Sequence, residues 1–406
     1  MDSITRRRRF ALFVFFFLPG VSLASWVTRT PAIRDALGAS IAEMGLVLFG
    51  ISIGSMTGIL SSGVLVARFG TRPIALASML IVMLSLLVIA GGVLVPSALL
   101  TAFGLFLFGL GMGTSEIAIN VDGADVERIS GQHVLHTLHG CFSLGTVFGA
   151  LLGIGATWLD FPVALHLAII AVIAVPLLLF FVRDIPYGIG IEPRAARGAP
   201  PIERGEPVWK DPRVILIGVV VLAMALAEGA ANDWLPLLMV DEYGFDQTSG
   251  SIVFLAFAAA MTTGRFAGGW FLARFGRVAV IRGSAVIGAI GLCFVIFAHS
   301  PILAGAAVVL WGLGASLGFP VAISAAGDSG PNPAMRVRIV AMVGYVAFLV
   351  GPPLLGFVGE EFGLRNAMLI VLGLVGLAAL LASAMQSKAI EGAGADQGLK
   401  PATFTA

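Results

Sequence analysis

The chain has 406 residues, of which 58% are hydrophobic and only 12% are charged, and its formal net charge at pH 7 is +1. Soluble domains carry roughly twice that share of charged residues, so this composition excludes a water-soluble globular protein. The lack of a basic excess argues against a nucleic-acid partner. Cys141 and Cys293 lie in separate apolar segments and form neither a disulfide framework nor a metal-ligand pattern.

The first predicted helix covers residues 9–29 and follows four consecutive arginines, Arg6–Arg9. The basic residues, the apolar run and the small residues near Ala24 would also fit a cleavable signal peptide. We predict that the segment is retained, because its removal would destroy the match between Trp26 and Trp234 in the two halves of the chain.

Eleven further spans follow when a 20-residue window is used to find stretches long enough to cross a bilayer. The first half continues with spans at 42–67, 73–93, 97–124, 132–158 and 162–182. The second half has spans at 212–240, 247–273, 279–298, 301–326, 335–358 and 364–385. The sequence therefore predicts an all-α membrane protein with twelve transmembrane helices.

Polar segments divide these spans into two groups. Residues 1–183 form the predicted N-terminal six-helix bundle, and residues 212–386 form the predicted C-terminal one. Residues 184–211 are rich in proline, glycine and charges of both signs, which is typical of a flexible linker. Residues 387–406 are small and polar, and we expect a disordered cytoplasmic tail.

The two groups of spans carry a repeated motif. Gly63-Val-Leu-Val-Ala-Arg68-Phe-Gly70 returns 206 positions later as Gly269-Trp-Phe-Leu-Ala-Arg274-Phe-Gly276. A match at this spacing, with others at nearly the same offset, indicates a duplicated half of about 200 residues. Two parallel membrane repeats that face each other across a central site are typical of transporters.

Basic residues predict the orientation of the chain in the membrane. With the N-terminus inside, twenty lysines and arginines fall in cytoplasmic segments and three fall outside: Arg29, Arg34 and Arg365. The positive-inside rule therefore predicts that both termini are cytoplasmic.

These features resemble the major facilitator superfamily over roughly residues 9–386: twelve helices in two repeated halves, a long middle loop and Gly-x4-Arg-x-Gly after the second and eighth helices. Several shorter runs are similar to the fucose-permease-like sugar:proton symporters and their uncharacterised bacterial relatives. They are Ser25-Trp26-x2-Arg29-x-Pro31, Asn120-x2-Gly123-x3-Glu127, Leu138-His139-Gly140-x-Phe142-Ser143-Leu144-Gly145 and Glu228-Gly229-x3-Asp233-Trp234. The resemblance implies alternating access around one site lined by the first, fourth, seventh and tenth helices.

The loop motif differs from the family pattern at one position. The superfamily has an acidic residue before the arginine, whereas this chain has Ala67 and Ala273 there. The resemblance implies that this acid helps to hold the cytoplasmic side closed. We therefore expect the inward-open state to be populated readily.

Acids inside the predicted spans are candidates for the transport pathway, because a charge at a helix centre costs about 2.5–3.5 kcal/mol. Glu116 and Asn120 lie one turn apart on the fourth span, and Glu228 and Asn232 repeat this spacing on the seventh. Two such polar faces predict a wet pathway between the halves. The alternative is a carboxylate tied to a fixed cation for helix packing.

Arg265, within the eighth span, needs a counter-anion. Glu116 lies at a similar predicted depth, so we expect these two residues to pair, which would leave Glu228 without a cation and suited to carry a proton. Asp233 and Arg29 lie near the periplasmic ends of equivalent spans and are predicted to form an outer ion pair.

Histidines and tryptophans supply further candidates. His133, His136 and His139 are spaced three apart, which turns the first and last to different sides of a helix and argues against a metal site. We interpret the first two as loop-end residues and His139 as a candidate proton relay. Trp26 and Trp234 are predicted to be either interfacial anchors or stacking surfaces for a sugar ring.

Glycine and proline positions bear on helix packing and bending. Glycines at or near small-x3-small spacing, such as Gly109 and Gly145, predict tight packing, or smooth faces on which the halves rock. Pro352 and Pro353 remove two backbone donors, so the eleventh span is expected to bend and expose carbonyl groups. Asp122 and Asp125 lie at a cytoplasmic end and are expected to be solvated or to anchor a loop.

The sequence thus predicts a secondary active transporter of the bacterial inner membrane that moves a small polar solute, such as a sugar, together with protons. It contains no ATP-binding loop, no hydrolase arrangement and no zinc motif, so we expect a monomeric protein that is not an enzyme and needs no cofactor. Two alternatives remain open: proton-driven efflux of a small hydrophobic or amphipathic compound, and a membrane sensor or scaffold that transports nothing.

Overall fold

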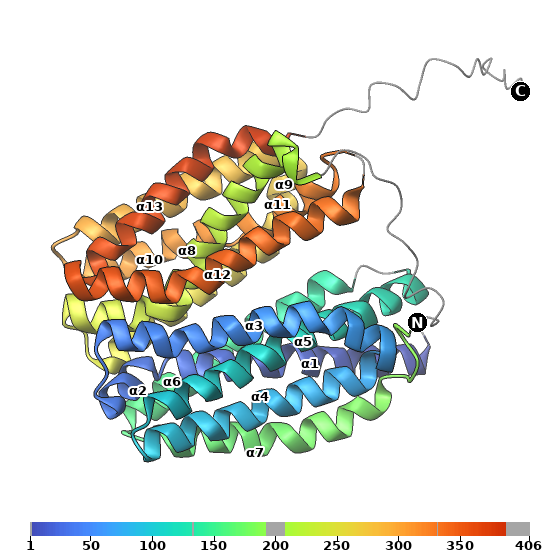
Figure 1. Ribbon diagram of the computed structural model, residues 1–406, viewed down its shortest axis with the longest axis horizontal. Helices are drawn as coiled ribbons and strands as arrows, with labels where there is room; N and C mark the ends of the chain where they lie inside the picture. The colour runs from blue at the N-terminus through green and yellow to red at the C-terminus, as the bar shows by residue number, and fades with distance from the viewer. Residues whose placement is uncertain (1, 132–133, 192–207, 331, 387–406) are drawn as a thin grey trace, which may run out of the picture.

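The structure, a computed structural model, describes residues 2–131, 134–191, 208–330 and 332–386 (Figure 1). The predicted tail at 387–406, most of the predicted linker and His133 lie outside the described residues. All regular elements in the described part are helices.

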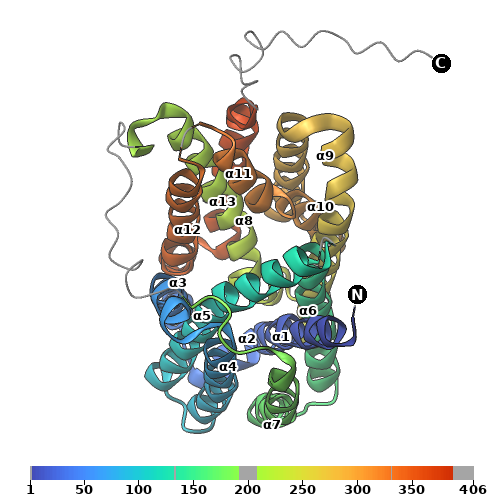
Figure 2. The same cartoon turned by 90° about the vertical axis from the view of Figure 1, so that its right-hand side faces the viewer.

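Two groups of helices follow each other along the chain. The first group is α1 (Ser3–Val27), α2 (Thr30–Leu37), α3 (Ile41–Phe69), α4 (Thr71–Leu94), α5 (Ala98–Ser130), α6 (Leu135–Trp158), α7 (Val163–Phe181) and η1 (Val182–Asp184). The second is η3 (Val208–Lys210), α8 (Pro212–Tyr243), α9 (Gln247–Phe297), α10 (Pro301–Ala315), α11 (Gly318–Gly327), α12 (Pro333–Phe362), α13 (Leu364–Leu381) and η4 (Ala382–Met385). The two groups lie side by side as separate bundles (Figures 1 and 2).

Eleven helical segments in the described residues are long and apolar enough to cross a membrane. The longest, α9, contains two predicted spans, because the backbone leaves the helical region at Gly276 (φ 73°, ψ 169°). Its repeat partner Gly70 has nearly the same conformation (φ 85°, ψ 169°) between α3 and α4. Positive φ favours glycine at both turns. The predicted all-α fold in two six-helix bundles is confirmed.

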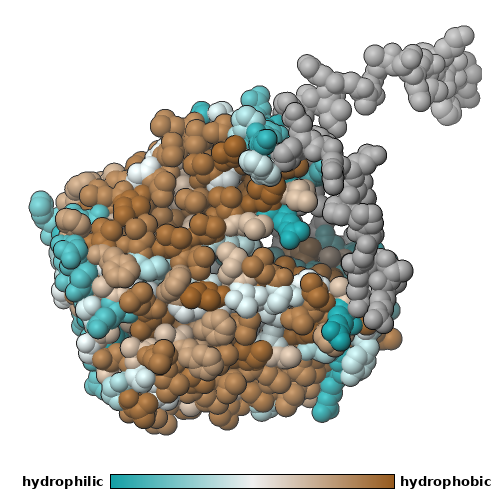
Figure 3. Space-filling view, in the orientation of Figure 1, coloured by the Kyte–Doolittle hydropathy of each residue, from teal (hydrophilic) through white to brown (hydrophobic). Residues whose placement is uncertain are grey.

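The outer surface has the polarity of a membrane protein. In Figure 3, hydrophobic residues cover the middle of the molecule, while hydrophilic residues gather at its two ends. Exposed apolar side chains such as Leu99, Phe180 and Leu380 would be costly in water but are suited to hydrocarbon.

Glycines bring helices within one bundle very close together. A Cβ at Gly109 of α5 would lie 2.0 Å from the carbonyl oxygen of Ile51 in α3, and one at Gly145 of α6 would lie 2.2 Å from that of Phe17 in α1. No larger residue fits at either position without movement of a backbone. The predicted role of these glycines in tight packing is confirmed.

The two bundles meet most closely at one end, which we call the closed end. Five hydrogen bonds or ion pairs between the bundles involve residues 28–52 of the first: Arg34 with Asp241, Gln247 with Asp35, Glu360 with the Ala42 amide, Ser251 with the Thr28 carbonyl, and Ser52 with the Phe348 carbonyl.

Toward the opposite end, which we call the open end, α3 and α12 diverge (Figure 1), and Figure 3 shows a hollow between the bundles. On the other side of the interface α6 and α9 stay close, with the ring of Phe266 over Gly140. The N-terminus of α1 lies at the open end, so this end is the one that the basic residues predict to face the cytoplasm.

Candidate functional site

An ion pair joins α8 and α9 halfway along the C-terminal bundle. Arg265 donates a hydrogen bond to Glu228, with 2.9 Å between Nη2 and Oε1. Both side chains keep some contact with solvent, since Arg265 is 30% exposed and Glu228 is 17% exposed. The predicted pairing of Arg265 with Glu116 is therefore wrong, and so is the view of Glu228 as an acid without a cation.

Helix geometry explains why Arg265 meets Glu228. Glu228 lies about 15 residues before the end of α8, and Arg265 about 18 residues into α9. A rise of 1.5 Å per residue places them within about 5 Å of the same depth on two consecutive, antiparallel helices. The long arginine side chain spans that difference easily. The pair needs no approach of the two bundles.

Of the two predicted pathway glutamates, Glu116 has no cation partner in the described residues. Its side chain is solvent-exposed although it lies in the middle of α5. Within the described residues its carboxylate makes no hydrogen bond or ion pair, and it lies within electrostatic range of Glu228 and Tyr345 from the other bundle. Glu116 therefore faces the space between the bundles.

Asn120 and His139 continue this polar surface toward the open end. The Asn120 side chain donates to the Glu116 carbonyl at 2.7 Å, which fixes its amide one turn from the Glu116 carboxylate. Its oxygen lies 3.1 Å from Nε2 of His139 in α6, whose ring packs edge-on against Phe16 at 5.2 Å. Asn120 thus connects the backbone of Glu116 to the exposed imidazole of His139, the residue that the sequence predicts as a relay.

A proline-freed carbonyl connects α12 to α3. Pro352 has no N–H to donate to the carbonyl of Phe348 one turn earlier, and the Ser52 hydroxyl of the opposite bundle donates to it instead at 2.6 Å. The predicted exposure of a carbonyl by the double proline is confirmed. The freed group holds the bundles together next to the hollow.

Trp26 and Trp234 were assigned wrongly to the membrane interface or the cavity mouth. Trp26 is 1% exposed and packs against the ring of Phe108, and Trp234 is 0% exposed with its ring edge near Gly356. Both are core residues. Tryptophan occurs both at membrane interfaces and in helix-packed cores. The repeat of Trp26 and Trp234 in the sequence therefore could not tell which of these two environments they occupy.

The predicted outer pair of Arg29 and Asp233 is absent as well. Arg29 donates instead to the Thr157 hydroxyl at 3.1 Å and to the Phe161 carbonyl at 2.6 Å, which ties the turn between α1 and α2 to the end of α6. Burial lowers the pKa of Arg29, and the charge of Asp160 partly opposes this effect. Among the described residues, Asp233 and the half-buried Asn232 have no hydrogen-bond partner for their side chains.

The closed end has an ion pair that sequence reasoning missed. Arg34 of the short helix α2 pairs with Asp241 at the end of α8 and also with Asp35. Burial alone would lower the pKa of Arg34, but the hydrogen bonds and charges of Asp241 and Asp35 outweigh it and raise that pKa. Arg34 carried a usable signal, since it lies in a short basic segment on the predicted outer side.

The repeated loop motif forms two similar turns at the open end. Gly70 and Gly276 provide the positive φ described above, whereas Gly63 and Gly269 face open space and have no steric requirement for glycine. Arg68 stacks on the ring of Phe69 at 5.1 Å.

In the second loop Arg274 is exposed, and no hydrogen bond or ion pair of its side chain is seen in the described residues. The residue after each turn contacts an acid. Thr71 donates to Asp122 at 2.7 Å, and Arg277 pairs with Asp328 at 2.6 Å.

Tyr345 and Ser52 are site residues that the sequence analysis overlooked. Tyr345 is one of only three tyrosines in the chain and lies within an apolar span, which was an available signal. Ser52 had none, because a serine in a small-residue helix usually bonds its own backbone. No group of three metal-ligating side chains occurs in the described residues; His133 and the side chain of His136 lie outside that part.

Two membrane bundles with a polar, accessible surface between them have the architecture of a transporter that binds its solute at the repeat interface. The chain belongs to the Major Facilitator Superfamily, whose family model matches residues 10–338.

An uncharacterized MFS-type transporter of Yersinia pestis is 31% identical over 356 residues, which cover 87% of this chain and 89% of the relative. The crystal structure of nucleoside transporter NupG has a similar fold, with a TM-score of 0.70 and 15% identity over 95% of this chain and 99% of that one. The E. coli fucose:proton symporter FucP matches with a TM-score of 0.64 and 17% identity over 94% and 98%. The predicted location in the bacterial inner membrane as a multi-pass protein is confirmed.

Proposed function

We propose that this transporter is secondary active, moves a small polar solute by alternating access and couples that movement to protons. The observation that carries the proposal is Glu116, an accessible carboxylate halfway along α5 that faces the other bundle without a cation. In contrast, Glu228 is neutralised by Arg265.

The physical reason lies in the cost of moving an unpaired charge. An isolated carboxylate must be hydrated or neutralised before the hollow around it closes, because an ionised group at the membrane centre is strongly disfavoured. Uptake of a proton by Glu116 provides this neutralisation. His139 and Asn120 continue the polar surface from Glu116 toward the open end, which keeps the approach to the carboxylate hydrated.

The same groups favour a solute with several hydroxyl groups. Carboxylate, amide, imidazole, guanidinium and phenol groups from five helices and both bundles offer donors and acceptors in one region, while the rest of the helices are apolar. Convergent polar groups in an apolar setting fix the orientation of a polar ligand. Sugars and nucleosides are the first solutes to test, since proteins of similar fold transport fucose and nucleosides.

The test has two steps. A thermal-shift screen of the purified protein against sugars, nucleosides, acids and amines identifies a stabilising solute. Proteoliposomes then measure uptake of this solute under an imposed pH gradient. Glu116→Gln is expected to keep solute exchange but to abolish accumulation against the gradient, while Glu361→Gln, an exposed glutamate at the end of α12, is expected to behave like the unmodified protein.

Unchanged accumulation by Glu116→Gln would rule out this residue as the coupling site. Flux out of the vesicle lumen rather than into it, under the same gradient, would favour proton-driven efflux. No flux of any stabilising solute would favour a sensor or scaffold.

A further inference from the structure

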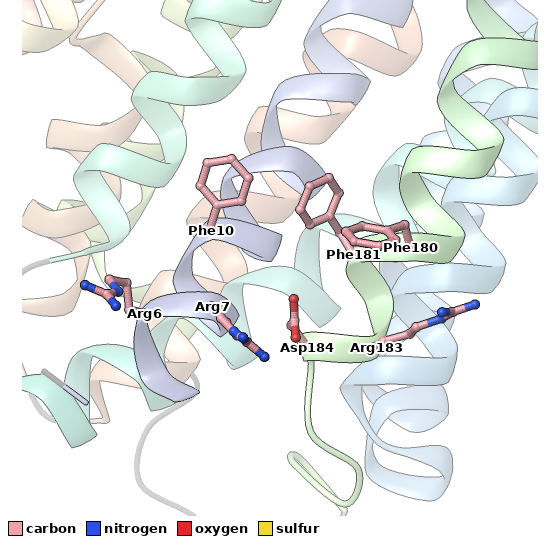
Figure 4. Close-up of a pocket in the computed structure, with 7 residues that line it drawn as sticks. All are labelled: Arg6, Arg7, Phe10, Phe180, Phe181, Arg183 and Asp184. Carbon is pink, nitrogen blue, oxygen red and sulfur yellow. The ribbon is translucent and has the colours of Figure 1, made fainter. Parts of the chain in front are cut away.

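A cleft of about 490 Å³ opens on the outer side of the N-terminal bundle, between the start of α1 and the end of α7 (Figure 4). It lies at the open end of the molecule, away from Glu116 and the space between the bundles. Its volume falls in the range typical of ligand pockets. Three arginines, one aspartate and three phenylalanines line it, and the proposed transport function uses none of them.

The four consecutive arginines at the start of α1 divide between different environments. Arg8 turns into the bundle and pairs with Asp122 and Asp125 at 2.7 and 2.8 Å. Arg9 lies over the ring of Phe13. Arg6 and Arg7 remain at the cleft, so their positions are not explained by the anchoring of α1.

The arginines of the cleft have no ion-pair contacts within the described residues. In the described part of the chain, the guanidinium groups of Arg6, Arg7 and Arg183 make no hydrogen bond or ion pair. Asp184 offsets one of the three positive charges, which leaves the cleft with a net charge of +2. Figure 4 shows Arg7 and Asp184 between the two helices, with Arg6 and Arg183 on the outer flanks.

Aromatic rings form the side of the cleft nearer the apolar belt. Phe10 and Phe181 lie 5.4 Å apart between their ring centroids, and Phe180 meets Phe181 edge-on at 5.1 Å. Phe10 is 54% exposed and Phe180 is 61% exposed, so both rings are open to the surroundings of the bundle. The cleft therefore presents positive charge beside exposed apolar rings.

We propose that this cleft binds the headgroup of an anionic phospholipid, with the phosphate at Arg7 between Arg6 and Arg183 and the acyl chains along Phe10 and Phe180. Basic pockets between helices at the cytoplasmic boundary suit anionic headgroups. Charge complementarity and the exposed rings favour a lipid over free phosphate, because a soluble anion has no use for the apolar side.

The test is native mass spectrometry of the full-length protein in detergent, with phosphatidylglycerol or phosphatidylcholine of identical acyl chains added. Phosphatidylglycerol is expected to remain bound in preference to phosphatidylcholine. The triple variant Arg6→Gln, Arg7→Gln, Arg183→Gln is expected to lose this preference. The amount of bound phosphatidylglycerol should fall about fivefold for each arginine removed, so Arg7→Gln alone should lower it about fivefold. Because the three guanidinium groups make no hydrogen bond or ion pair with the described residues, thermal unfolding in detergent should stay unchanged.

A control with equal charge loss is available at the same end. Arg68→Gln, Arg274→Gln, Arg338→Gln removes three exposed arginines outside the cleft and is expected to keep the lipid preference. If both triple variants lost the preference for phosphatidylglycerol equally, the preference would come from general surface charge, and the proposal would be overturned. Displacement of the lipid by inorganic phosphate at constant ionic strength would show a phosphate site instead, and it would overturn the proposal as well.

Discussion

The two bundles share the geometry of their repeated loops but differ in the polar residues of the candidate site. Gly70 and Gly276, Thr71 and Arg277, and Asp122 and Asp328 are each 206 positions apart. In both bundles the glycine makes the turn with positive φ, and the next residue contacts the acid of the matching helix. The repeat therefore preserves a contact as well as a sequence, although a hydroxyl makes it in one bundle and a guanidinium in the other.

The site residues break this symmetry. At the same offset, Glu116 of the first bundle corresponds to Ala322, and Glu228 of the second corresponds to Ser22, whose hydroxyl donates to the Leu18 carbonyl of its own helix. The duplication thus places two similar bundles face to face. Because the matched positions carry different residues, the polar surface between the bundles is asymmetric. The repeat therefore determines the helical framework, whereas the polar groups of the candidate site lie at positions where the two halves differ.

The largest expected difference between the bundles concerns the matched acids. Asp122 is 1% exposed and holds Arg8 and Thr71, whereas Asp328 is 57% exposed. Asp122→Asn leaves Arg8 poorly compensated in the interior and should cost about 3–5 kcal/mol of folding stability. Asp328→Asn should cost about 1 kcal/mol or less. Thermal unfolding in detergent compares the two, and equal losses would show that the first bundle does not depend on this anchor.

The second effect concerns the ion pair that the first bundle lacks. Glu228→Gln strands Arg265 in the middle of the membrane, and because the pair is partly solvated we expect a loss of about 2–3 kcal/mol. Adding Arg265→Gln should recover part of the lost folded yield. Additive losses in this double-mutant cycle would mean that the two residues do not interact. Glu116→Gln should have little effect on stability, since no partner is lost.

The third effect tests the shared turns. Gly276→Ala and Gly70→Ala place a Cβ in a conformation with positive φ, and each should cost about 1–2 kcal/mol. Gly269→Ala and Gly63→Ala add the same atom where nothing lies within 4 Å, so they serve as matched controls. We expect them to be neutral or slightly stabilising in the same thermal assay. Strong destabilisation by the controls would contradict the assignment of the motif to the turn glycines.

The smallest effect concerns the contact between the bundles. Ser52→Ala removes the hydrogen bond to the Phe348 carbonyl, which is worth about 1 kcal/mol. Because this bond closes one side of the hollow, its loss should shift the population toward the outward-open state by up to roughly fivefold. Labelling of a cysteine introduced at Asn120 from the open end should slow accordingly. The control is Ser61→Ala, whose hydroxyl bonds its own helix.

Much of the fold was determined by the sequence itself. Hydropathy located the spans, and the 206-residue offset of Gly63–Gly70 and Gly269–Gly276 predicted two equivalent bundles. These features are readable because the bilayer requires each crossing segment to satisfy its own backbone hydrogen bonds, so length and polarity decide the outcome locally. The free carbonyl near the double proline could also be predicted from the sequence, since proline lacks a backbone N–H wherever it occurs.

Only the tertiary structure decided which polar groups meet. Arg265 pairs with Glu228 and not with Glu116, because Glu228 lies at nearly the same depth on the neighbouring helix of the same bundle, whereas Glu116 belongs to the other bundle. Trp26 and Trp234 lie in the core because neighbouring helices cover them, which no spacing reveals. A membrane span is a property of one segment, and a repeat is a property of two segments of the sequence. Ion pairs and burial instead depend on how several helices pack against one another.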